Sequence, residues 1–364
     1  MFNREIRQER LPEPAPSVNA VTPIEGAWRD RLYQGDNLDV LRALLADPAV
    51  RGQVRLVYID PPFGTGQSFT VSPGRRATIS RASNGSTAYD DGLVGNDYLS
   101  FLQPRLELIR ELLADDGSIC VHIDCKIGHY VKVLMDQVFG SANFRSDITR
   151  IKCNPKNFQR LGYGNVKDMI LFYTKGESFV WNHPRVPFVE QDLQRLFRKI
   201  DAEGRRYTTT PLHAPGETKN GPTGEPWKGL NPPPGRHWRY TPDVLTALDE
   251  ANLIEWSSTG NPRKKIYAED ASANGKYLQD VWVFKDPPYP RYPTEKNLDM
   301  LKVIVGASSN PGDLVMDCFC GSGGTLVAAQ EMGWRWIGVD RSEIAIGICE
   351  VRLGVRHSQV GEEG

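Results

Sequence analysis

A chain of 364 residues is long enough to bury a full hydrophobic core, as one large domain or two smaller ones. Hydrophobic residues make up 40% and charged residues 24%, which is ordinary for a globular protein, and no apolar run reaches the roughly 20 residues of a membrane span. The net charge of −1 argues against a general nucleic-acid binder. We expect no membrane contact and, because the first 20 residues lack an apolar stretch of signal-peptide type, a cytoplasmic location.

The first half of the chain predicts alternating strands and helices. The run "VRLVYID" (54–60) is continuously apolar, which is typical of a strand buried on both faces. A long Gly/Ser/Thr-rich loop (64–96) with Arg75, Arg76 and Arg81 follows it. The other predicted elements are a strand and helix (31–47), a helix (96–117), a strand (118–124), a helix (126–140) and strands (146–153, 167–176). This alternation favours a parallel, doubly wound α/β sheet.

The middle of the chain has a different composition. Residues 208–238 are too rich in Pro and Gly for regular structure, so we expect an irregular insertion with one short helix near 242–253. Residues 141–290 hold 22 Lys and Arg against 17 Asp and Glu, together with five of the eight tryptophans. Clustered positive charge with aromatic residues fits a surface that meets phosphates and bases. A solvated face over a small aromatic core explains the same counts equally well.

Regular α/β patterning resumes with a helix (294–308), a strand (313–319), a helix (324–333), a strand (334–340) and a helix (342–354). The first of these strands ends near Asp317 and enters the Gly-rich loop 321–324, where the backbone can approach a ligand closely. Leu326 stands where the dinucleotide fingerprint has a third glycine. Asp340 ends the next strand, at the position where an acid accepts hydrogen bonds from ribose hydroxyls. Two such acids predict a nucleoside-type cofactor; the alternative is a sheet edge with solvated acids.

The segment "DPPF", Asp60-Pro61-Pro62-Phe63, suits chemistry on an amino group of a base. Such nitrogens are poor nucleophiles because their lone pair is delocalised into the ring. A carboxylate and a backbone carbonyl that accept both N–H bonds would favour the tetrahedral nitrogen. Asp60 supplies the carboxylate, Pro61 and Pro62 present rigid carbonyls, and Phe63 offers a stacking face for an extruded base. Taken alone, the segment would by default be interpreted as a proline-rich turn that ends a strand.

The group Cys120, His122 and Cys125 has residue types that bind zinc, but it lies on an apolar strand pattern. Zinc sites draw their ligands from more than one segment, so we interpret these as buried side chains and expect no metal.

Together these motifs resemble the amino-directed DNA methyltransferases that use S-adenosylmethionine. "DPPF" matches their catalytic motif, and "DCFCGSGGT" (317–325) matches their cofactor loop. The order, with the catalytic motif first, is that of the circularly permuted β-class. The resemblance extends to modification subunits of type III systems and related solitary methyltransferases, over about residues 30–183 and 280–354. It implies a Rossmann-like methyltransferase sheet whose cofactor half is C-terminal.

The resemblance also implies roles for single residues. Asp317, Phe319, Gly321 and Gly323 would line the methionine and ribose pocket, and Asp340 would bind the ribose. Thr294 and Lys296 would open a helix near the methionine end of the cofactor, and Asp36 would lie near its adenine. Thr325 stands one place later than the threonine of many members, because Gly324 intervenes.

A second motif, "DPPY" at 286–289, raises the question of which copy is catalytic. Asp60 is followed by a complete helix–strand–helix unit, whereas Asp286 leads at once into the segment 292–296 of the cofactor half. No crossover unit follows Asp286 from which a parallel strand could be built. We therefore predict that Asp60 is catalytic and that the second motif is a linker.

We predict an enzyme that methylates adenine N6 in duplex DNA after base flipping, with N4-cytosine as the alternative. An RNA or small-molecule methyltransferase and an inactive DNA-binding subunit stay open. The expected domains are an N-terminal tail (1–29), a catalytic half (30–183), a target-recognition insertion (184–279), a cofactor half (280–356) and a C-terminal tail (357–364). The possible partners besides DNA are a second copy of the chain, a restriction subunit and a cognate endonuclease. We expect a bacterial-type protein that associates with the nucleoid through DNA. The loop arginines named above and Arg150, Lys152, Lys156 and Arg160 are expected on DNA phosphates.

Overall fold

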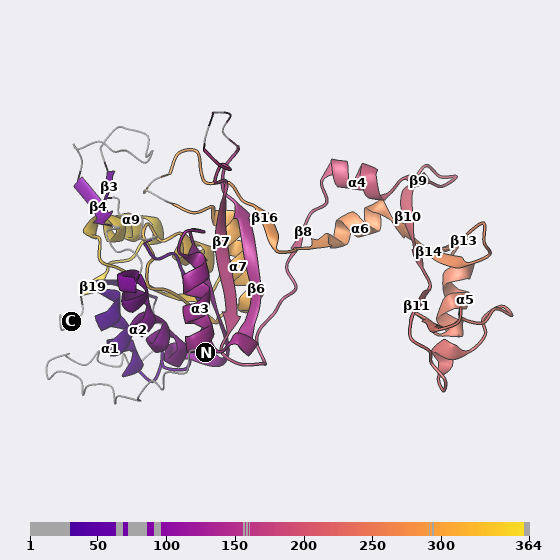
Figure 1. The fold of residues 1–364 in the computed structure, drawn as a ribbon, viewed down its shortest axis with the longest axis horizontal. Coiled ribbons are helices and arrows are strands. Elements are labelled where there is room, and N and C mark those ends of the chain that lie inside the picture. The colour runs from indigo at the N-terminus through magenta and orange to yellow at the C-terminus, as the bar shows by residue number, and fades with distance from the viewer. Residues whose placement is uncertain are drawn as a thin grey trace. The chain divides into compact units, whose positions relative to one another are not determined.

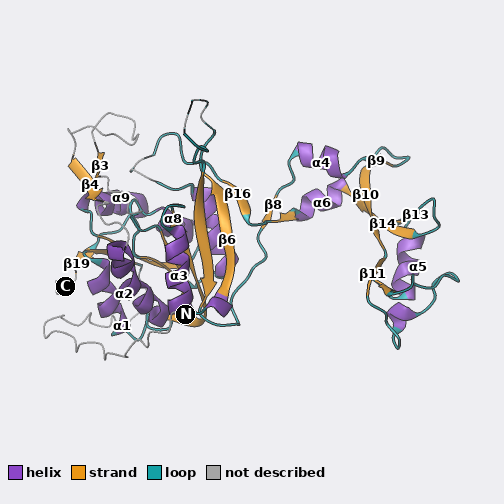
Figure 2. Ribbon diagram, viewed as in Figure 1, coloured by secondary structure: helices purple, strands orange, loops and turns teal. Residues whose placement is uncertain are grey.

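The computed structural model describes residues 30–62, 68–71, 86–90, 96–155, 157, 159, 161–290, 292 and 295–359. The chain divides into two compact units, drawn in Figures 1 and 2. The large unit contains the residues up to Asn182 and those from Gln279 onward, and the small unit is His183–Leu278. The two segments of the large unit therefore come together to form one fold.

A mixed, mostly parallel sheet forms the centre of the large unit. Within the described residues it has nine strands in the order β16-β6-β7-β5-β2-β17-β18-β1-β19, and only β7 runs antiparallel to its neighbours. The strands are β1 (Arg31–Gln34), β2 (Val54–Ile59), β5 (Leu113–Ile123), β6 (Phe144–Ile151), β7 (Lys167–Thr174), β16 (Val281–Val283), β17 (Leu314–Asp317), β18 (Arg335–Asp340) and β19 (Ser358–Gln359). A separate hairpin pairs β3 (Ser68–Val71) with β4 (Ser86–Asp90).

Helices cover both faces of this sheet (Figure 1). One layer is α1 (Asn37–Leu45), α2 (Asn96–Leu112) and α3 (Gly128–Phe139), and the other is α7 (Leu298–Ser308), α8 (Gly324–Met332) and α9 (Glu343–Leu353); a short 3-10 turn, η1, spans Ser141–Asn143. Alternate residues of β2 serve the two layers: Val57 and Ile59 belong to the core under α1–α3, and Leu56 and Tyr58 face the other side. The predicted doubly wound, Rossmann-like α/β class is confirmed.

The chain changes direction across the sheet between two adjacent strands, β2 and β17. From β2 it continues through α2 to the neighbouring β5, and from β17 it continues through α8 to β18, on the opposite side. Val57 and Met316 are paired across this boundary. Ligands of open α/β sheets bind at such a switch point, outside the carboxyl ends of the strands.

The small unit contains more regular structure than the sequence predicted. We expected residues 208–238 to be irregular, but β10 joins a four-stranded antiparallel sheet, β13-β14-β10-β9, and β11 pairs with β12. The elements are β8 (Arg185–Val186), α4 (Glu190–Leu196), β9 (Lys199–Ile200), β10 (Arg206–Pro211), β11 (His213–Pro215), η2 (Pro222–Gly224), β12 (Arg236–Trp238), α5 (Pro242–Glu250), β13 (Ile254–Trp256), β14 (Pro262–Tyr267), α6 (Ala268–Asn274) and β15 (Lys276–Tyr277).

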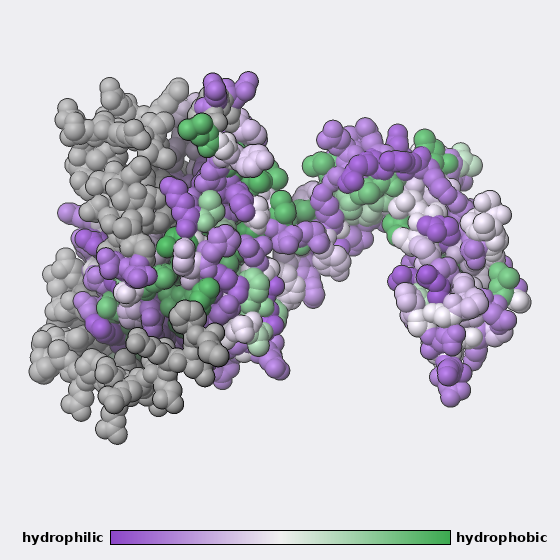
Figure 3. All heavy atoms as spheres, viewed as in Figure 1, coloured by the Kyte–Doolittle hydropathy of each residue, from purple (hydrophilic) through white to green (hydrophobic). Residues whose placement is uncertain are grey.

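A small aromatic core explains why this Pro- and Gly-rich unit folds. Trp227 and Trp238 are buried with Leu212, Leu245 and Ile254. The exposed Trp256 stacks on Trp227 with an interplanar angle of 2°. The surrounding surface is mostly hydrophilic in the view of Figure 3. The small aromatic core of the second interpretation is therefore present, and a surface that meets phosphates and bases stays a prediction.

Two expectations about the return of the chain to the large unit were wrong. We expected no crossover unit after Asp286, but α7 connects β16, the strand before Asp286, to β17, which runs in the same direction. The helix expected from residue 294 begins at Leu298, where the side chain of Asn297 accepts a hydrogen bond from the backbone of Met300. Lys296 therefore precedes the helix, and Thr294 lies outside the described residues. No helix in the described part of the chain has the length and apolar content that crossing a membrane demands.

The Gly-rich loop is shaped by close packing as well as by backbone conformation. Gly323 precedes α8 with φ +78°, and a Cβ atom there would lie 2.8 Å from the Sγ atom of Cys349 on α9. Gly333, at the other end of α8, has φ +84° and no atom within 4 Å of a Cβ position. The two glycines therefore share a conformation but differ in their surroundings.

We predict that Gly323→Ala lowers the free energy of unfolding by roughly 2–4 kcal/mol, the sum of left-handed strain and overpacking. Gly333→Ala should cost only the strain, about 1–2 kcal/mol. Urea denaturation of both variants measures the difference. Equal losses would contradict the contact with Cys349 as a determinant of stability.

Candidate active site

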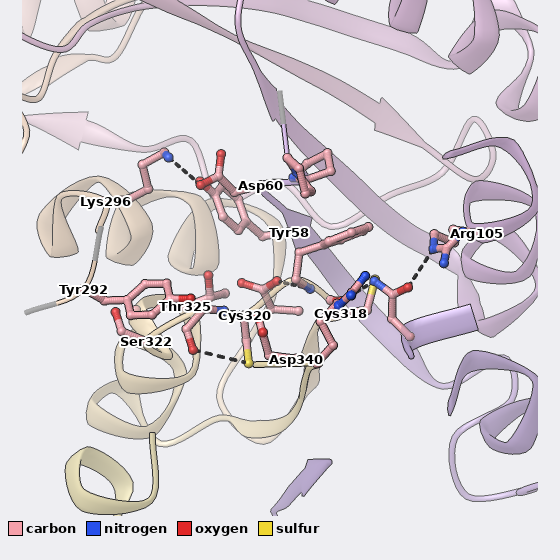
Figure 4. Close-up of a pocket in the computed structure, with 18 of the residues that line it drawn as sticks. Tyr58, Asp60, Arg105, Tyr292, Lys296, Cys318, Cys320, Ser322, Thr325 and Asp340 are labelled. Carbon is pink, nitrogen blue, oxygen red and sulfur yellow. Dashed lines mark hydrogen bonds and ion pairs between the residues drawn. The ribbon is translucent and has the colours of Figure 1, made fainter. Parts of the chain in front are cut away.

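One pocket lies at the switch point, at the carboxyl ends of β2 and β17. Figure 4 shows its walls, which come from segments far apart in the sequence. The lining residues are Gly35–Asn37, Tyr58, Asp60–Pro62, Tyr98, Phe101, Arg105, Tyr292, Glu295, Lys296, Leu301, Asp317–Ser322, Gly324, Thr325, Asp340 and Arg341. The catalytic motif and the cofactor loop of the sequence analysis thus face the same pocket.

Asp60 follows β2 and holds its two carboxylate oxygens in different environments. Oδ2 forms an ion pair with the ammonium group of Lys296, which points to it in Figure 4. Oδ1 is buried, and no hydrogen-bond partner for it exists among the described residues. A buried carboxylate oxygen without a partner is costly, so a donor from a bound molecule would stabilise this arrangement.

Lys296 forms a contact in the pocket that the sequence did not suggest. We expected it near the methionine end of a cofactor, and it lines the pocket but contacts the carboxylate of Asp60. Both side chains are largely buried, at 9% and 16% exposure. Lys296 therefore orients Asp60 and leaves Oδ1 as the available acceptor.

Asp317 ends β17 and is almost completely buried. Its Oδ1 accepts a hydrogen bond of 3.0 Å from the backbone of Phe319, and Thr325 donates to it from the start of α8. Burial raises the pKa of Asp317 to about 7, with further contributions from the nearby carboxylates of Asp60 and Asp340, and the two hydrogen bonds oppose this shift. The group is consequently poised to ionise when a cation enters the pocket.

Asp340 ends β18, next to β17, and accepts two backbone hydrogen bonds of 2.9 Å. Oδ2 accepts from Gly321 in the Gly-rich loop, and Oδ1 accepts from Ser342 at the start of α9. Burial raises the pKa of Asp340, and these hydrogen bonds partly oppose the effect. Each oxygen keeps a further lone pair for a ligand hydroxyl. Asp340 therefore shapes the loop and can still serve a ligand.

Asp36 contributes to the wall on the side of α1 and α2. Its side chain caps α1 through the backbone N–H of Leu38, at 2.8 Å, and accepts from Arg105 at 3.0 Å. Arg105 also donates to Asn37 at 2.6 Å, and Asn37 in turn donates to the backbone carbonyl of Cys318 at 2.7 Å. The guanidinium group lies 3.7 Å from the ring centroid of Phe101. This network attaches α1 and α2 to the Gly-rich loop.

The predicted cofactor residues Asp36, Lys296, Asp317, Phe319, Gly321, Thr325 and Asp340 all line the pocket, as do Asp60, Pro61 and Pro62 of the catalytic motif. Gly323 does not line it, because this residue turns toward α9 and packs against Cys349. Phe63 and Thr294 lie outside the described residues.

The expectation that Arg150 binds DNA phosphates was wrong. Its side chain is fully buried between strands, where it donates to the carbonyl of Phe284 and contacts Asp168 and Asp286. Lys152 is also mostly buried and forms an ion pair of 2.5 Å with Asp168. Both cations compensate internal carboxylates. The other expected phosphate contacts, Arg75, Arg76, Arg81, Lys156 and Arg160, lie outside the described residues.

Several pocket residues carried no local sequence signal. Asn37, Phe101 and Arg105 lie on helices that look amphipathic and ordinary, and only the tertiary structure brings them to the loop. Tyr58 could have been found, because it lies two residues before Asp60 and side chains at that spacing share a face of a strand. His122, considered above as a zinc ligand, is buried and hydrogen-bonded to Tyr58 and Asp168.

The pocket as a whole suits a cationic nucleoside. Five carboxyl groups line it, and backbone N–H groups of Phe319 and Gly321 hold two of them, Asp317 and Asp340; the others are Asp36, Asp60 and Glu295. Aromatic rings of Phe101 and Phe319 lie 6.2 Å apart in an edge-to-face arrangement at its wall. Acids for hydroxyl and ammonium groups, together with apolar rings for a base, match the functional groups of S-adenosylmethionine. The residues present therefore fit this cofactor.

Comparisons with known proteins agree with this geometry. The DNA methylase family that covers N6 and N4 enzymes matches residues 54–350. The type II methyltransferase M.EcaI of Enterobacter cloacae is 42% identical over 316 residues, which are 85% of this chain and 67% of that protein. The StyLTI Mod subunit of a type III restriction-modification enzyme from Salmonella typhimurium is 27% identical over 354 residues, or 87% of this chain and 52% of that subunit.

Solved structures include the M1.HpyAVI–SAM complex, which is 15% identical, covers 89% of this chain and 99% of that one, and has a TM-score of 0.49. The present chain spans about two thirds of the length of the type II relative and about half of the type III subunit. The family match covers both halves of the large unit, and the methyl donor of this family is S-adenosylmethionine. The chain belongs to the N6/N4 DNA methylase family.

Proposed function

We propose that this DNA methyltransferase acts on adenine N6 in duplex DNA and that Asp60 binds the target amino group. The observation that supports this assignment is the buried Oδ1 atom of Asp60, which has no hydrogen-bond partner in the described part of the chain. It lies at the carboxyl end of β2, beside the strand that leads into the Gly-rich loop. An N–H group of an extruded base would satisfy this oxygen.

When bound, S-adenosylmethionine supplies an electrophilic methyl group on a sulfonium. We assign Asp317 to its ammonium and ribose region and Asp340 to its ribose hydroxyls, because both acids line the pocket next to the Gly-rich loop. Asp36 and the aromatic wall of Phe101 are assigned to the adenine end. Lys296 keeps Asp60 oriented through the ion pair, and Gly323 packs the Gly-rich loop against Cys349.

Asp60 and the carbonyl groups of the following prolines would hold the amine by both N–H bonds. The nitrogen lone pair would then form the bond to the methyl carbon, the S–C electron pair would stay on sulfur, and the nitrogen would lose one proton. Oδ1 of Asp60 is the nearest assigned acceptor for that proton. Orientation and electrostatic stabilisation carry the reaction, with no covalent bond between enzyme and base.

Adenine is proposed over cytosine because Asp before Pro-Pro is usual in the adenine enzymes that the motif resembles. A charged acceptor at one edge of the base also suits the large adenine ring, whose face Phe63 would cover.

We further propose that the small unit, residues 183–278, selects the DNA sequence, and that the protein works in the cytoplasm of a bacterial-type cell. We propose that the protein acts as a homodimer or together with a restriction subunit or cognate endonuclease. The mass of the assembly in solution distinguishes these alternatives.

Nucleoside mass spectrometry of DNA methylated by the purified protein tests the choice of base. We expect N6-methyladenine in duplex DNA and no product on RNA or free nucleosides. N4-methylcytosine without N6-methyladenine would overturn the adenine assignment and leave the role of Asp60 intact, since both amines suit the same acceptors.

Asp60→Asn should lower methyl transfer by at least about 100-fold, because the amide lacks the charge that stabilises the reacting nitrogen. Cofactor affinity, measured by calorimetry, should change little, since Asp60 is not assigned to any cofactor group. The matched control is Asp136→Asn, which removes another lysine-paired carboxylate, bonded to Lys132 at 2.8 Å and away from the pocket. Equal losses in both variants would remove Asp60 from catalysis.

Asp317→Asn should change how stability depends on pH in the cofactor-free protein. The folded pKa of Asp317 is raised to about 7 from 3.8, so its contribution to stability is complete below about pH 4 and is lost as pH rises toward 7. The asparagine of the variant does not ionise, so the variant does not lose stability in this way as pH rises. Its free energy of unfolding should therefore rise relative to wild type by up to roughly 4 kcal/mol between pH 4 and 8. A difference that stays constant over this range would show that Asp317 is not poised as described.

A further inference from the structure

A row of buried polar side chains runs along the carboxyl edge of the sheet, away from the cofactor loop. It begins at Tyr58 on β2, whose hydroxyl group lies 2.8 Å from Nδ1 of His122 on β5. Nε2 of His122 lies 3.3 Å from Oδ2 of Asp168 on β7. The three strands are neighbours in the sheet. All three side chains are buried, although only Tyr58 lines the pocket.

The row continues to the second DPP motif. Arg150 on β6 is the direct cross-strand partner of Asp168, and its guanidinium group contacts that carboxylate at 3.4 Å and Asp286 at 2.5 Å. Lys152 also pairs with Asp168. Asp286 follows β16, the edge strand beside β6. The segment that we expected to be a linker therefore anchors the outer end of a hydrogen-bonded row that reaches the active site.

The charges in this row determine where the proton of His122 lies. Burial raises the pKa of Asp168, but hydrogen bonds from His122 and Lys152 outweigh it and hold the pKa well below its usual range. Burial lowers the pKa of His122, against the opposing effect of Asp168. A neutral imidazole beside a carboxylate carries its proton on the nitrogen that faces the carboxylate, here Nε2. Nδ1 is then an acceptor, so the hydroxyl of Tyr58 must donate to it.

This direction of donation matters for the pocket. Tyr58 lies on the same face of β2 as Asp60 and beside it in Figure 4. Burial raises the pKa of Tyr58 well above its usual value, and Asp60 is the next largest cause, which means that the hydroxyl is protonated and within electrostatic reach of that carboxylate. Because its single proton is directed to His122, the oxygen keeps lone pairs that no proton of its own occupies, and Tyr58 is a lining residue of the pocket.

We propose that Oη of Tyr58, in place of a proline carbonyl, accepts the second N–H group of the target amine beside Asp60, and that His122 positions it. This inference rests on the proposed function of the pocket. The exocyclic nitrogen gains positive charge while its bond to carbon forms, and oxygen lone pairs nearby stabilise that charge. Asp168 fixes the tautomer of His122, and Arg150 with Lys152 keeps Asp168 ionised. Tyr58 touches substrate in this scheme, whereas His122 and Asp168 act only through it.

The tautomer can be measured without cofactor or DNA. In protein with nitrogen-15-labelled histidine, His122 is one of six histidines and is assigned by comparison with His122→Gln. We expect a neutral ring with its proton on Nε2 at pH 7. Asp168→Asn should reverse the tautomer, because the amide oxygen would take the position facing Lys152 and the amide N–H the one facing His122. A proton on Nδ1 in the wild type would overturn the proposal.

Kinetics test the role of Tyr58 itself. Tyr58→Phe should lower kcat by about 10- to 100-fold and leave the cofactor dissociation constant and the KM for DNA nearly unchanged. The matched control is Tyr173→Phe, which removes a buried tyrosine hydroxyl on β7 that donates to Asp136 at 2.7 Å outside the pocket. Both variants should lose similar stability, and only the first should lose turnover.

The outcomes separate this inference from the function on which it rests. If the wild type transfers no methyl group to DNA, the proposed function fails. If the wild type is active and Tyr58→Phe keeps wild-type kcat, only the acceptor role fails and Tyr58 is a core residue like Tyr173. Asp168→Asn gives the second check. It should reverse the tautomer of His122 and lower kcat, because Tyr58 would then direct its proton into the pocket. Full turnover with a reversed tautomer would contradict the inference.

Discussion

The pairing of β2 with β17 is the constraint on which the site depends. These strands come from opposite ends of the large unit's sequence, and the register that aligns Val57 with Met316 brings Asp60 and Asp317 to one edge of the sheet. Neither segment forms a pocket alone. The buried backbone hydrogen bonds between the strands hold Asp60, the proposed acceptor of the target amine, beside the loop proposed to bind the methyl donor. Catalysis by orientation requires that fixed relation.

The pocket concentrates negative charge in a buried place. Asp317 and Asp340 have raised pKa values because burial disfavours their charged forms, while backbone N–H groups of the loop and of α9 reduce that cost. Lys296 compensates one oxygen of Asp60. The remaining electrostatic cost is offset when a cationic ligand binds. A site that is unfavourable in the free protein in this way favours a cationic ligand, which agrees with the sulfonium of the family's methyl donor.

The buried cations show why charge counts misled the sequence analysis. Arg150 and Lys152 contribute to the positive middle section, yet both neutralise carboxylates inside the sheet. The sequence alone does not distinguish a basic residue that faces solvent from one that is buried between strands. Only the antiparallel pairing of β6 with β7, which sets Arg150 opposite Asp168, decides between these positions. The same pairing gives the second DPP motif a structural partner.

The sequence by itself determined the doubly wound fold, the family and most of the pocket's acids, because strand ends, a Gly-rich loop and a proline pair are local patterns with few alternatives. Helix starts, the small sheet of residues 199–267 and the inward turn of Gly323 depended on contacts with distant segments, as Cys349 shows for Gly323. The ion pair of Lys296 with Asp60 and the row from Tyr58 to Asp286 were likewise decided by the tertiary structure. Their members are separated along the chain, and hydrogen bonds of 2.5–3.4 Å exist only once the sheet has set the register of its strands.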